Sequence, residues 1–276
     1  MKMKAVIPAA GLGTRMLPLT KAQPKEMLPV ARKPTIQYII EEAYEAGIRE
    51  ILIITGKHKR AIEDHFDRYE HDVRNGELEK LDRILEEMTI YYVRQKRPKG
   101  LGDAILHARA FADGEPFTLL LGDTITQPAC IKEAIELHEK TGKSVVSLEK
   151  VPSEKVSLYG IVRIENGRIT ELVEKPSPEK APSQWAILGR YVLTPDLFDY
   201  IKEVEPDRKG EIQLTDALQL MVEDGKEVLP HFFSGRRYDI GNFLDWLRAN
   251  VELALEDPML GEDFRRIIEE ALKDVR

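Results

Sequence analysis

The chain of 276 residues contains only one cysteine, Cys130. A single thiol excludes an intrachain disulfide and a cysteine-based metal cluster. The sequence also lacks an apolar run long enough to cross a membrane, and its first four residues lead directly into an apolar strand instead of a signal-peptide core. We therefore expect a cytoplasmic protein that does not contact membranes.

The chain has fewer basic than acidic residues. It contains 41 Lys and Arg residues and 48 Asp and Glu residues, which gives a formal net charge of −7 at pH 7. This balance disfavours a binder of nucleic acid polymers, although an acidic protein can still contain a basic pocket. The sequence shows no internal repeat and no low-complexity linker. We expect a single domain over residues 1–276.

Two widespread nucleotide-binding signatures are incomplete. The Gly-x-Gly-x-x-Gly loop of NAD-dependent oxidoreductases would need a third glycine where this chain has Met16, and helix-breaking Pro18 follows soon after. The Gly-Lys-Ser/Thr sequence of a P-loop is absent from the same loop. The sequence therefore argues against both an NAD-dependent oxidoreductase and a P-loop phosphotransferase.

The N-terminal segment does contain a loop of small residues after an apolar strand, Ala9-Ala10-Gly11-Leu12-Gly13, followed by Arg15 and Lys25. Small residues let the backbone approach a ligand closely, and their free N–H groups can bind phosphate oxygens. Arg15 and Lys25 would supply positive charge, and Pro24 stiffens the loop next to Lys25. This combination predicts a nucleotide site.

The first half of the chain alternates apolar strands with amphipathic helices. Strands are expected over 51–55, 89–94 and 117–121, and helices over 34–46, 57–69 and 104–112, with a charged helical excursion over 70–88. The alternation implies a mostly parallel sheet covered on both faces. Ligands of such sheets bind at the carboxyl ends of the strands, where the glycine loop and Asp123 would both lie.

The second half changes pattern. Asn166-Gly167 is the strongest hairpin signal in the sequence, and it joins expected strands over 159–165 and 168–174. Strands joined by a tight turn cannot form a parallel crossover, so we expect antiparallel strands added to the parallel sheet. Further strands are expected over 144–151 and 185–193, and helices over 195–203, 214–223, 243–256 and 262–273.

Six segments follow one another along the chain: Ala9 to Arg15, Pro24 to Pro29, Lys33-Pro34, Gly122-Asp123, Val173 to Pro176 and Gly210 to Asp216. Together they resemble the sugar-nucleotide pyrophosphorylases, and the resemblance covers nearly the whole chain. It implies an α/β fold, a Rossmann-like α/β/α sandwich with a mixed, mostly parallel central sheet, an added antiparallel hairpin and C-terminal helices. It also implies a nucleotide-binding half over about 1–143, a sugar-binding half over about 144–240 and C-terminal helices over about 241–276.

The resemblance implies that the protein converts UTP and glucose 1-phosphate into UDP-glucose and pyrophosphate in the presence of Mg²⁺. Such a transfer needs positioning and charge neutralisation more than a covalent nucleophile. Arg15 and Lys25 are assigned to the triphosphate. Asp123 is the leading Mg²⁺ ligand, because hard cations prefer carboxylate and phosphate oxygens, although its local sequence also suits a helix cap. The resemblance adds Asp239 as the second ligand.

The resemblance assigns the sugar phosphate to Lys175 and the sugar hydroxyls to Glu174. A carboxylate can accept hydrogen bonds from two adjacent hydroxyl groups, although the local sequence alone would favour an exposed ion pair. Gly160 and Gly189 are placed beside the sugar, where a missing side chain leaves room for the ring. Turn or bulge geometry explains both glycines equally well.

Base recognition is expected from Gln95, with the backbone around Ala10 and Gly100. A glutamine amide offers a donor and an acceptor, so it can pair with the imide edge of uracil. The same amide suits thymine, so a thymidylyltransferase acting on glucose 1-phosphate is the alternative within the enzyme class. A non-catalytic sugar-nucleotide sensor is the alternative of another class. A sensor has no need for the complete set of charges assigned to the transferring phosphate.

The sequence departs from the family pattern at two positions. Asp103 stands where a histidine is expected, and Thr124 stands where a second aspartate is common. A carboxylate near a triphosphate would repel it, so we expect the Asp103 side chain to turn away. Thr124 removes a carboxylate next to the metal site. Apolar residues in the last two helices suggest a homo-oligomer, either a dimer or a tetramer.

Overall fold

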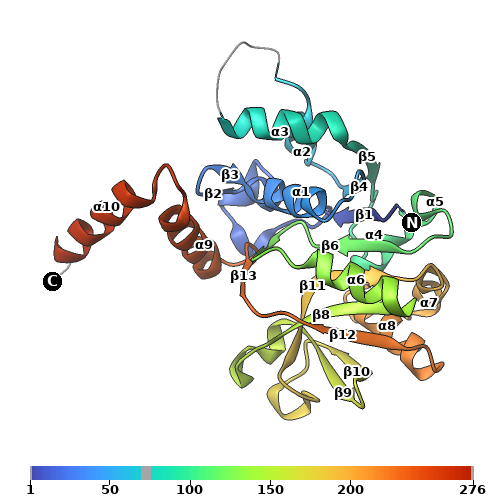
Figure 1. Ribbon diagram of the computed structural model, residues 1–276. Coiled ribbons are helices and arrows are strands. Elements are labelled where there is room, and N and C mark those ends of the chain that lie inside the picture. The colour runs from blue at the N-terminus through green and yellow to red at the C-terminus, as the bar shows by residue number, and fades with distance from the viewer. Residues whose placement is uncertain (1, 70–75, 275–276) are drawn as a thin grey trace.

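The computed structural model describes residues 2–69 and 76–274 (Figure 1). Across these residues, nine strands form a central sheet in the order β10-β9-β11-β6-β1-β4-β5, with β8 paired to β11 and β12 paired to β8. The strands are β1 (Lys4–Pro8), β4 (Glu50–Thr55), β5 (Thr89–Arg94), β6 (Phe117–Leu120), β8 (Ser144–Lys150), β9 (Gly160–Glu165), β10 (Arg168–Glu174), β11 (Trp185–Leu193) and β12 (Val228–Phe232).

Strand direction follows from the pairings. β1 pairs in parallel with β4 and β6, β4 pairs in parallel with β5, and β12 pairs in parallel with β8. β11 pairs antiparallel with β6, β8 and β9, and β10 pairs antiparallel with β9. Among the described strands of this sheet, all except β10 and β11 therefore run in one direction. The predicted mixed, mostly parallel sheet with an added antiparallel hairpin is confirmed.

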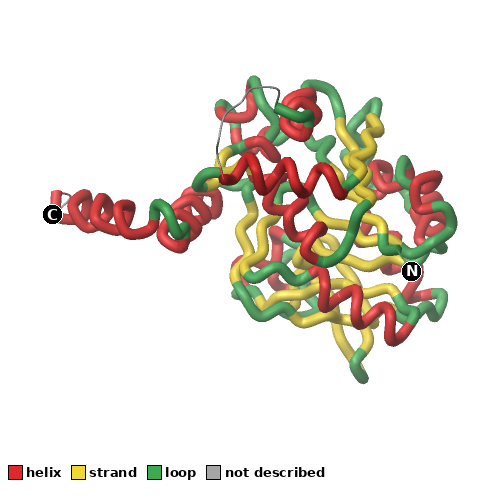
Figure 2. The backbone as a smooth tube through the Cα atoms, turned by 45° about the horizontal axis from the view of Figure 1, so that its top comes forward, coloured by secondary structure: helices red, strands yellow, loops and turns green. Residues whose placement is uncertain are grey.

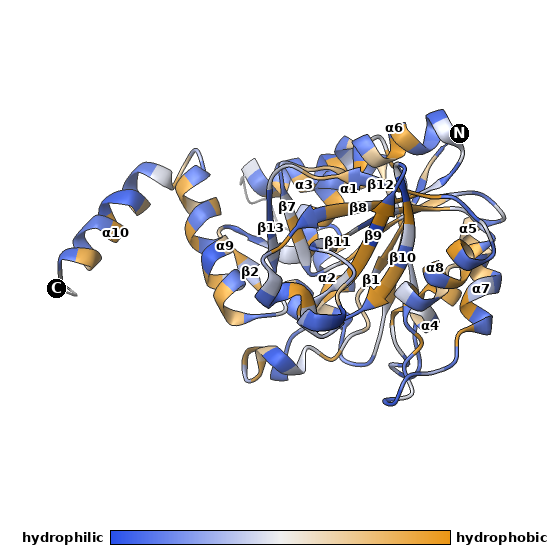
Figure 3. Cartoon of the chain, turned by 90° about the horizontal axis from the view of Figure 1, so that it is seen from below, coloured by the Kyte–Doolittle hydropathy of each residue, from blue (hydrophilic) through white to orange (hydrophobic). Residues whose placement is uncertain are grey.

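Helices cover both faces of the sheet. The helices of the described chain are α1 (Thr35–Glu45), α2 (Arg60–Phe66), α3 (Gly76–Glu87), α4 (Leu101–Leu106), α5 (Arg109–Ala112), α6 (Ile131–Thr141), α7 (Leu197–Glu203), α8 (Leu214–Glu223), α9 (Phe243–Glu256) and α10 (Gly261–Asp274). In Figure 3, α1, α3 and α6 lie on one side of the sheet, and α4, α7 and α8 lie on the other.

The two faces of the sheet enclose separate cores because successive strand side chains point to opposite sides. Ala5 and Ile7 of β1 pack into the core shared with α1, α3 and α6, whereas Val6 packs into the core shared with α4, α7 and α8. Both sets are buried. This is why the strand is apolar at consecutive positions instead of alternating.

Two small sheets complete the fold. β2 (Pro29–Val30) pairs with β3 (Lys33–Pro34), and β7 (Thr124–Gln127) pairs with β13 (Arg236–Asp239). The second of these joins parts of the chain that are more than 100 residues apart in sequence. It begins directly after Asp123 and ends at Asp239, so it fixes the relative position of the two predicted metal ligands.

Some element bounds differ from the expectations. α1 begins at Thr35 because Pro34 has extended dihedral angles and pairs in β3. α2 begins at Arg60 because His58 has a positive φ of 65°. The expected helix over 104–112 is interrupted after Leu106, where backbone hydrogen bonds to the third preceding residue replace the α-helical ones. Residues 70–75 of the expected charged excursion lie outside the described residues.

The C-terminal helices extend from the body of the molecule (Figures 1 and 2). Asn242 caps α9, because its side-chain oxygen accepts a hydrogen bond of 2.9 Å from Asp245 N. Trp246 Nε1 donates a hydrogen bond of 2.9 Å to Pro29 O and so attaches α9 to β2. In the described part of the chain, no helix has both the length and the apolar character needed to cross a membrane.

Candidate active site

The glycine loop lies at the carboxyl end of β1 and is held by its own hydrogen bonds. Ala9 N donates to Ile54 O over 2.8 Å, which fastens the loop to β4. Gly13 has a φ of +67°, a conformation that favours glycine, and its carbonyl accepts a hydrogen bond of 2.8 Å from Thr20 Oγ1. The loop then turns into the 3₁₀ turn that contains Arg15.

Lys25 lies between this loop and Asp123. Its Nζ would be 3.8 Å from a Cβ placed on Gly11, and it forms an ion pair with Asp123 Oδ2. The Asp123 carboxylate follows β6, at the same edge of the sheet. Thus the predicted phosphate-binding lysine and the leading predicted metal ligand are neighbours.

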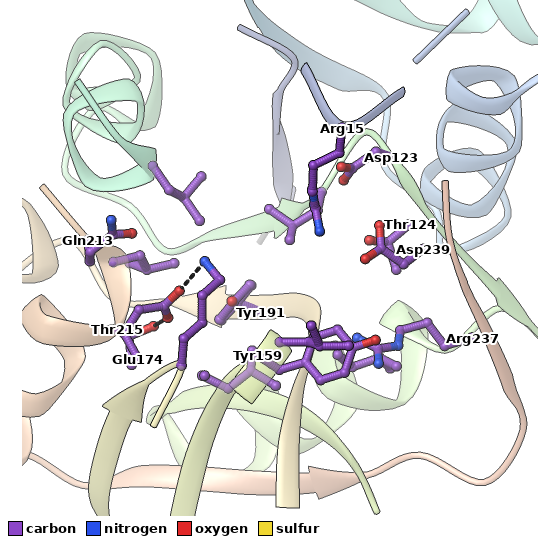
Figure 4. A pocket seen from close by; sticks show the side chains of 18 residues that line it. Arg15, Asp123, Thr124, Tyr159, Glu174, Tyr191, Gln213, Thr215, Arg237 and Asp239 are labelled. Atoms are coloured by element: carbon purple, nitrogen blue, oxygen red, sulfur yellow. Dashed lines mark hydrogen bonds and ion pairs between the residues drawn. The ribbon is translucent and has the colours of Figure 1, made fainter. Parts of the chain in front are cut away.

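Asp239 is brought to Asp123 by the β7–β13 pairing. Asp239 is opposite Thr124 in that ladder, and Ile240 N donates a hydrogen bond of 2.9 Å to Asp123 O. Gly241 N also donates to Asp239 Oδ1 over 2.8 Å. A Cβ on Gly241 would come within 2.8 Å of Arg15 Nη2, so the Arg15 guanidinium reaches this group from the glycine loop. Figure 4 shows Arg15, Asp123 and Asp239 around one cavity.

The two carboxyl groups differ in their electrostatic environment. Burial opposes the charged form of Asp123, but the charge and hydrogen bond of Lys25 outweigh it and lower the pKa of Asp123. Burial and the negative charge of Asp123 together raise the pKa of Asp239. Burial would lower the pKa of Lys25, but the charges of Asp123 and Glu26 raise it, so Lys25 is a permanent cation here. Asp123 is therefore paired with Lys25, whereas Asp239 is repelled by Asp123.

The opposite wall of the cavity contains Glu174 and Lys175. Lys175 Nζ donates to Glu174 Oε1 over 2.7 Å, and Thr215 Oγ1 donates to Glu174 Oε2 over 2.6 Å (Figure 4). Gly160 lies against this pair, because a Cβ on it would be 3.2 Å from Glu174 Oε2 and 2.8 Å from Ile187 Cδ1. A side chain at Gly160 would displace Glu174 or fill the cavity.

Lys175 adopts a backbone conformation that is unusual for a residue with a side chain. Its φ is +45°, and its N–H donates a hydrogen bond of 3.0 Å to Tyr159 O. Strained positions of this kind occur at functional sites when the surrounding structure holds them in place. The turn directs Lys175 from the end of β10 into the cavity, where its side chain remains half-exposed.

The expected base site lies on the other side of the glycine loop. Gln95 N donates to Thr55 O over 2.9 Å, and a Cβ on Gly56 would be 3.1 Å from Ala10 O. Gln95 therefore contacts Thr55, the last residue of β4, and Ala10 lies against Gly56, the residue that follows it. Gln95 is buried, and its side-chain nitrogen donates to Asp103 Oδ2 over 2.7 Å.

Six of the predicted residues line the cavity shown in Figure 4, namely Arg15, Asp123, Gly160, Glu174, Lys175 and Asp239. Lys25, Gln95 and the glycine loop lie behind or beside this cavity. Gly189 does not line it. Its φ of +88° occurs in a register shift of β11, and a Cβ there would be 2.9 Å from Leu121 Cδ1. Its assignment to the sugar stays a prediction.

Asp103 is not among the residues that line the cavity, and it accepts a hydrogen bond from the Gln95 amide. That its side chain turns away from a triphosphate stays a prediction. Sequence reasoning missed other residues. Thr215, which donates a hydrogen bond to Glu174, lies within the segment Gly210 to Asp216 that carries the family resemblance, so the sequence contains a signal for it. Arg237 directly precedes Tyr238-Asp239, and its guanidinium stacks 3.8 Å from the Tyr159 ring centroid on the cavity wall.

Two buried ion pairs lie next to the segments that contain Lys25 and Asp123. Lys59 Nζ donates to Glu26 Oε2 over 2.7 Å, with side chains only 5% and 1% exposed, and Glu26 follows Lys25 directly. Arg190 Nε donates to Glu42 Oε2 over 2.9 Å, and Arg190 Nη2 donates to Thr124 O over 2.7 Å. These contacts hold the segments that position Lys25 and Asp123.

A cavity with cations at one edge and a carboxylate pair beside them suits the binding of two phosphate-bearing substrates. A family model described as nucleotidyl transferase matches residues 4–256. The chain belongs to the nucleotidyl transferase family. Its six ordered segments, from the glycine loop to Asp216, lie within the matched range.

Several nucleotidyl transferases resemble this chain in both sequence and fold. UTP--glucose-1-phosphate uridylyltransferase of Staphylococcus epidermidis is 47% identical over 282 residues, which cover 97% of each chain. A crystal structure of UDP-glucose pyrophosphorylase complexed with UDP-glucose has a TM-score of 0.87 and 42% identity, covering 93% of this chain and all of that one. The UTP-bound enzyme of Acinetobacter baumannii has a TM-score of 0.85 and 34% identity over 98% and 99% of the two chains.

Proposed function

We propose that this nucleotidyl transferase forms UDP-glucose and pyrophosphate from UTP and glucose 1-phosphate. The observation that supports this most strongly is the arrangement of Arg15 and the Asp123–Asp239 pair on one wall of the cavity, opposite Glu174 and Lys175 on the other. The first wall suits a triphosphate with a divalent cation. The second suits a sugar phosphate.

The reaction is a substitution at the α-phosphorus of UTP. An oxygen of the glucose 1-phosphate group forms a new bond to that phosphorus, and the bond from it to the bridging oxygen of the β-phosphate breaks. The electron pair leaves with pyrophosphate, and no proton has to be transferred to complete the step. Because both reactants are anions, the protein accelerates it mainly by holding them in line and by neutralising charge.

On this proposal, the residues divide the work by position. Arg15, Lys25 and the N–H groups of the glycine loop bind the triphosphate, with Lys25 in direct reach of both the loop and Asp123. Lys175 binds the sugar phosphate. Glu174, whose two carboxylate oxygens are oriented by Lys175 and Thr215, accepts hydrogen bonds from sugar hydroxyls.

The carboxylate pair fits Mg²⁺. Asp123 and Asp239, which the β7–β13 pair brings together, would be its two carboxylate ligands. Within the described residues, no group of three or more His, Cys, Asp or Glu side chains is placed to hold a metal ion. Mg²⁺ commonly binds one or two carboxylates and completes its coordination with water and substrate phosphates. Burial and, after it, repulsion by Asp123 raise the pKa of Asp239, and a divalent cation would relieve the repulsion. When bound, Mg²⁺ supplies charge neutralisation at the phosphates.

The test is the stoichiometry of the two products. The protein is incubated with UTP, glucose 1-phosphate and Mg²⁺, and pyrophosphate and UDP-glucose are quantified together. We expect equal amounts, and no product when either substrate is omitted. A Lys25→Ala variant should lose about a hundredfold or more of kcat/KM, whereas Lys140→Ala, on the exposed side of α6, should be fully active. Binding of UDP-glucose without any turnover would instead identify a sensor.

We also propose that α10 packs against a second copy of the chain. Ile267 and Leu272 on this helix are 59% and 63% exposed, and Figure 2 shows the helix projecting from the body of the molecule. An amphipathic helix without a covered apolar face usually has a partner. Light scattering at micromolar concentration should give a dimer or a tetramer, and Ile267→Asp should reduce its mass. A monomeric wild-type protein would contradict the proposal.

A further inference from the structure

Asp103 contacts the residue to which we assign the nucleobase. Gln95 Nε2 donates to Asp103 Oδ2 over 2.7 Å and to Gly100 O over 3.3 Å. We propose that Asp103 is a positioning residue that fixes the Gln95 amide with its oxygen toward the nucleobase. The site would then select a base that presents an N–H donor at its pairing edge. This inference rests on the proposed function, because it takes the nucleotide to bind beside Gln95.

The orientation of the amide follows from the chemistry of its partners. An ionised carboxylate and a backbone carbonyl can only accept hydrogen bonds, so both must face the NH₂ side of Gln95. Turning the amide over would place its oxygen against an Asp103 oxygen, with two acceptors in contact. Both hydrogen bonds that the Gln95 side chain makes to Asp103 and Gly100 come from Nε2, which leaves Oε1 to accept from a ligand.

The backbone keeps Asp103 in this place. Ile212 N donates to Lys99 O over 2.7 Å, and Gly102 N donates to Ile212 O over 2.8 Å, so the segment before Asp103 pairs with a distant loop. Gly100 has a φ of +95°, and a Cβ on it would be only 2.5 Å from Ile212 O. Gln95 itself is 5% exposed. Neither partner can move away without breaking these contacts.

The consequence is discrimination between pyrimidines. Uracil offers an N3–H donor, which the fixed Gln95 oxygen can accept. Cytosine has an unprotonated N3 at the same position, so two acceptors would meet. Thymine has the same imide edge as uracil, so this device does not separate UTP from dTTP. A histidine at 103 could donate or accept, depending on its tautomer, and would leave only the longer contact to Gly100 O, of 3.3 Å, to orient the amide.

The experiment compares UTP with CTP as substrates for Asp103→Asn and Asp103→His. Both substitutions remove the group that can only accept, so the ratio of kcat/KM for UTP over CTP should fall by about tenfold or more, because a charge-assisted hydrogen bond no longer fixes the amide. Asp113→Asn is the matched control. Asp113 is exposed beyond α5 with a φ of +54°, which asparagine also adopts, and the ratio should be unchanged.

Calorimetric binding of UTP and CTP gives the same ratio without turnover, so the two proposals can be separated. If the wild-type protein releases no pyrophosphate, but the variants bind UTP over CTP with a lower ratio than the wild type, the proposed function is overturned and the role of Asp103 is supported. An active enzyme whose UTP-to-CTP ratio is the same in both variants would overturn the role of Asp103 alone. Equal loss for both nucleotides, together with a lower unfolding temperature, would show a structural role and also overturn it.

Discussion

Arg190→Met tests whether the ion pair beneath the carboxylates stabilises the fold. Arg190 is fully buried, and the Glu42 side chain is 5% exposed. The substitution removes two hydrogen bonds to Glu42 Oε2, of 2.9 and 2.7 Å, and leaves a buried carboxylate without its cation. Removing one partner of a buried pair costs about 3–5 kcal/mol, mainly because the other charge stays uncompensated.

The lower end of that range is expected here. Glu42 Oε1 still accepts hydrogen bonds from the backbone N–H groups of Cys130 and Ile131, over 3.2 and 3.1 Å, at the beginning of α6. A loss of about 3 kcal/mol corresponds to a decrease of about 5 °C in the unfolding midpoint of a chain of this length. Urea unfolding and calorimetry measure the two quantities. Activity should fall as well, because Thr124 O loses the donor that supports the strand next to Asp123.

Arg163→Met is the control for loss of an arginine from an ion pair. Arg163 Nε is 2.8 Å from Glu171 Oε2, but the two side chains are 47% and 40% exposed. Solvent screens such a pair, so this variant should unfold at nearly the wild-type temperature. If Arg190→Met is as stable as Arg163→Met, the buried pair does not stabilise the fold as argued.

Three further predictions concern the site and the C-terminal region. Asp123→Asn should reduce kcat by about a hundredfold or more while the protein stays folded at the assay temperature, and near-normal kcat at saturating Mg²⁺ would remove Asp123 from the metal site. Lys175→Ala should raise KM for glucose 1-phosphate by about tenfold with little change for UTP, and an unchanged KM would refute the assignment. Glu252, whose pKa falls to about 2 because hydrogen bonds from Arg248, Tyr238 and Arg236 outweigh burial, should stabilise the protein above about pH 4.5 and lose that effect as pH falls toward 2. The stability difference between wild type and Glu252→Gln should therefore shrink over this range in acid unfolding experiments, and a constant difference would contradict the assignment.

The parts of the fold with strong local signals could be predicted. β1 and β6 are buried on both faces and appear as short apolar runs, and Asn166-Gly167 marks the β9–β10 hairpin. The β7–β13 pair could not be found in this way, because its strands are short and partly polar and their partners are distant in sequence. α6 was missed despite Ile131, Ala134 and Ile135 at helical spacing.

The candidate site divides along the same line. The glycine loop and Asp123 can be inferred from their places after buried strands, where ligands of parallel sheets bind. Asp239 and Lys175 have no such local signal, because β13 is short and Lys175 depends on a positive φ after β10. The direction of the Gln95 amide depends on Asp103 and on a loop contact to Ile212, so only the three-dimensional arrangement reveals it.

The measurement that tests the proposed reaction most directly is pyrophosphate release with glucose 1-phosphate and Mg²⁺ when UTP, dTTP, CTP, ATP and GTP are supplied separately. The fixed Gln95 oxygen predicts rapid release with UTP and weak release with CTP and ATP, whose bases present an unprotonated ring nitrogen at the same edge. Equal or faster release with dTTP would keep the chemistry and change the assignment to a thymidylyltransferase. No release with any nucleotide, although UDP-glucose binds, would contradict nucleotidyl transfer itself.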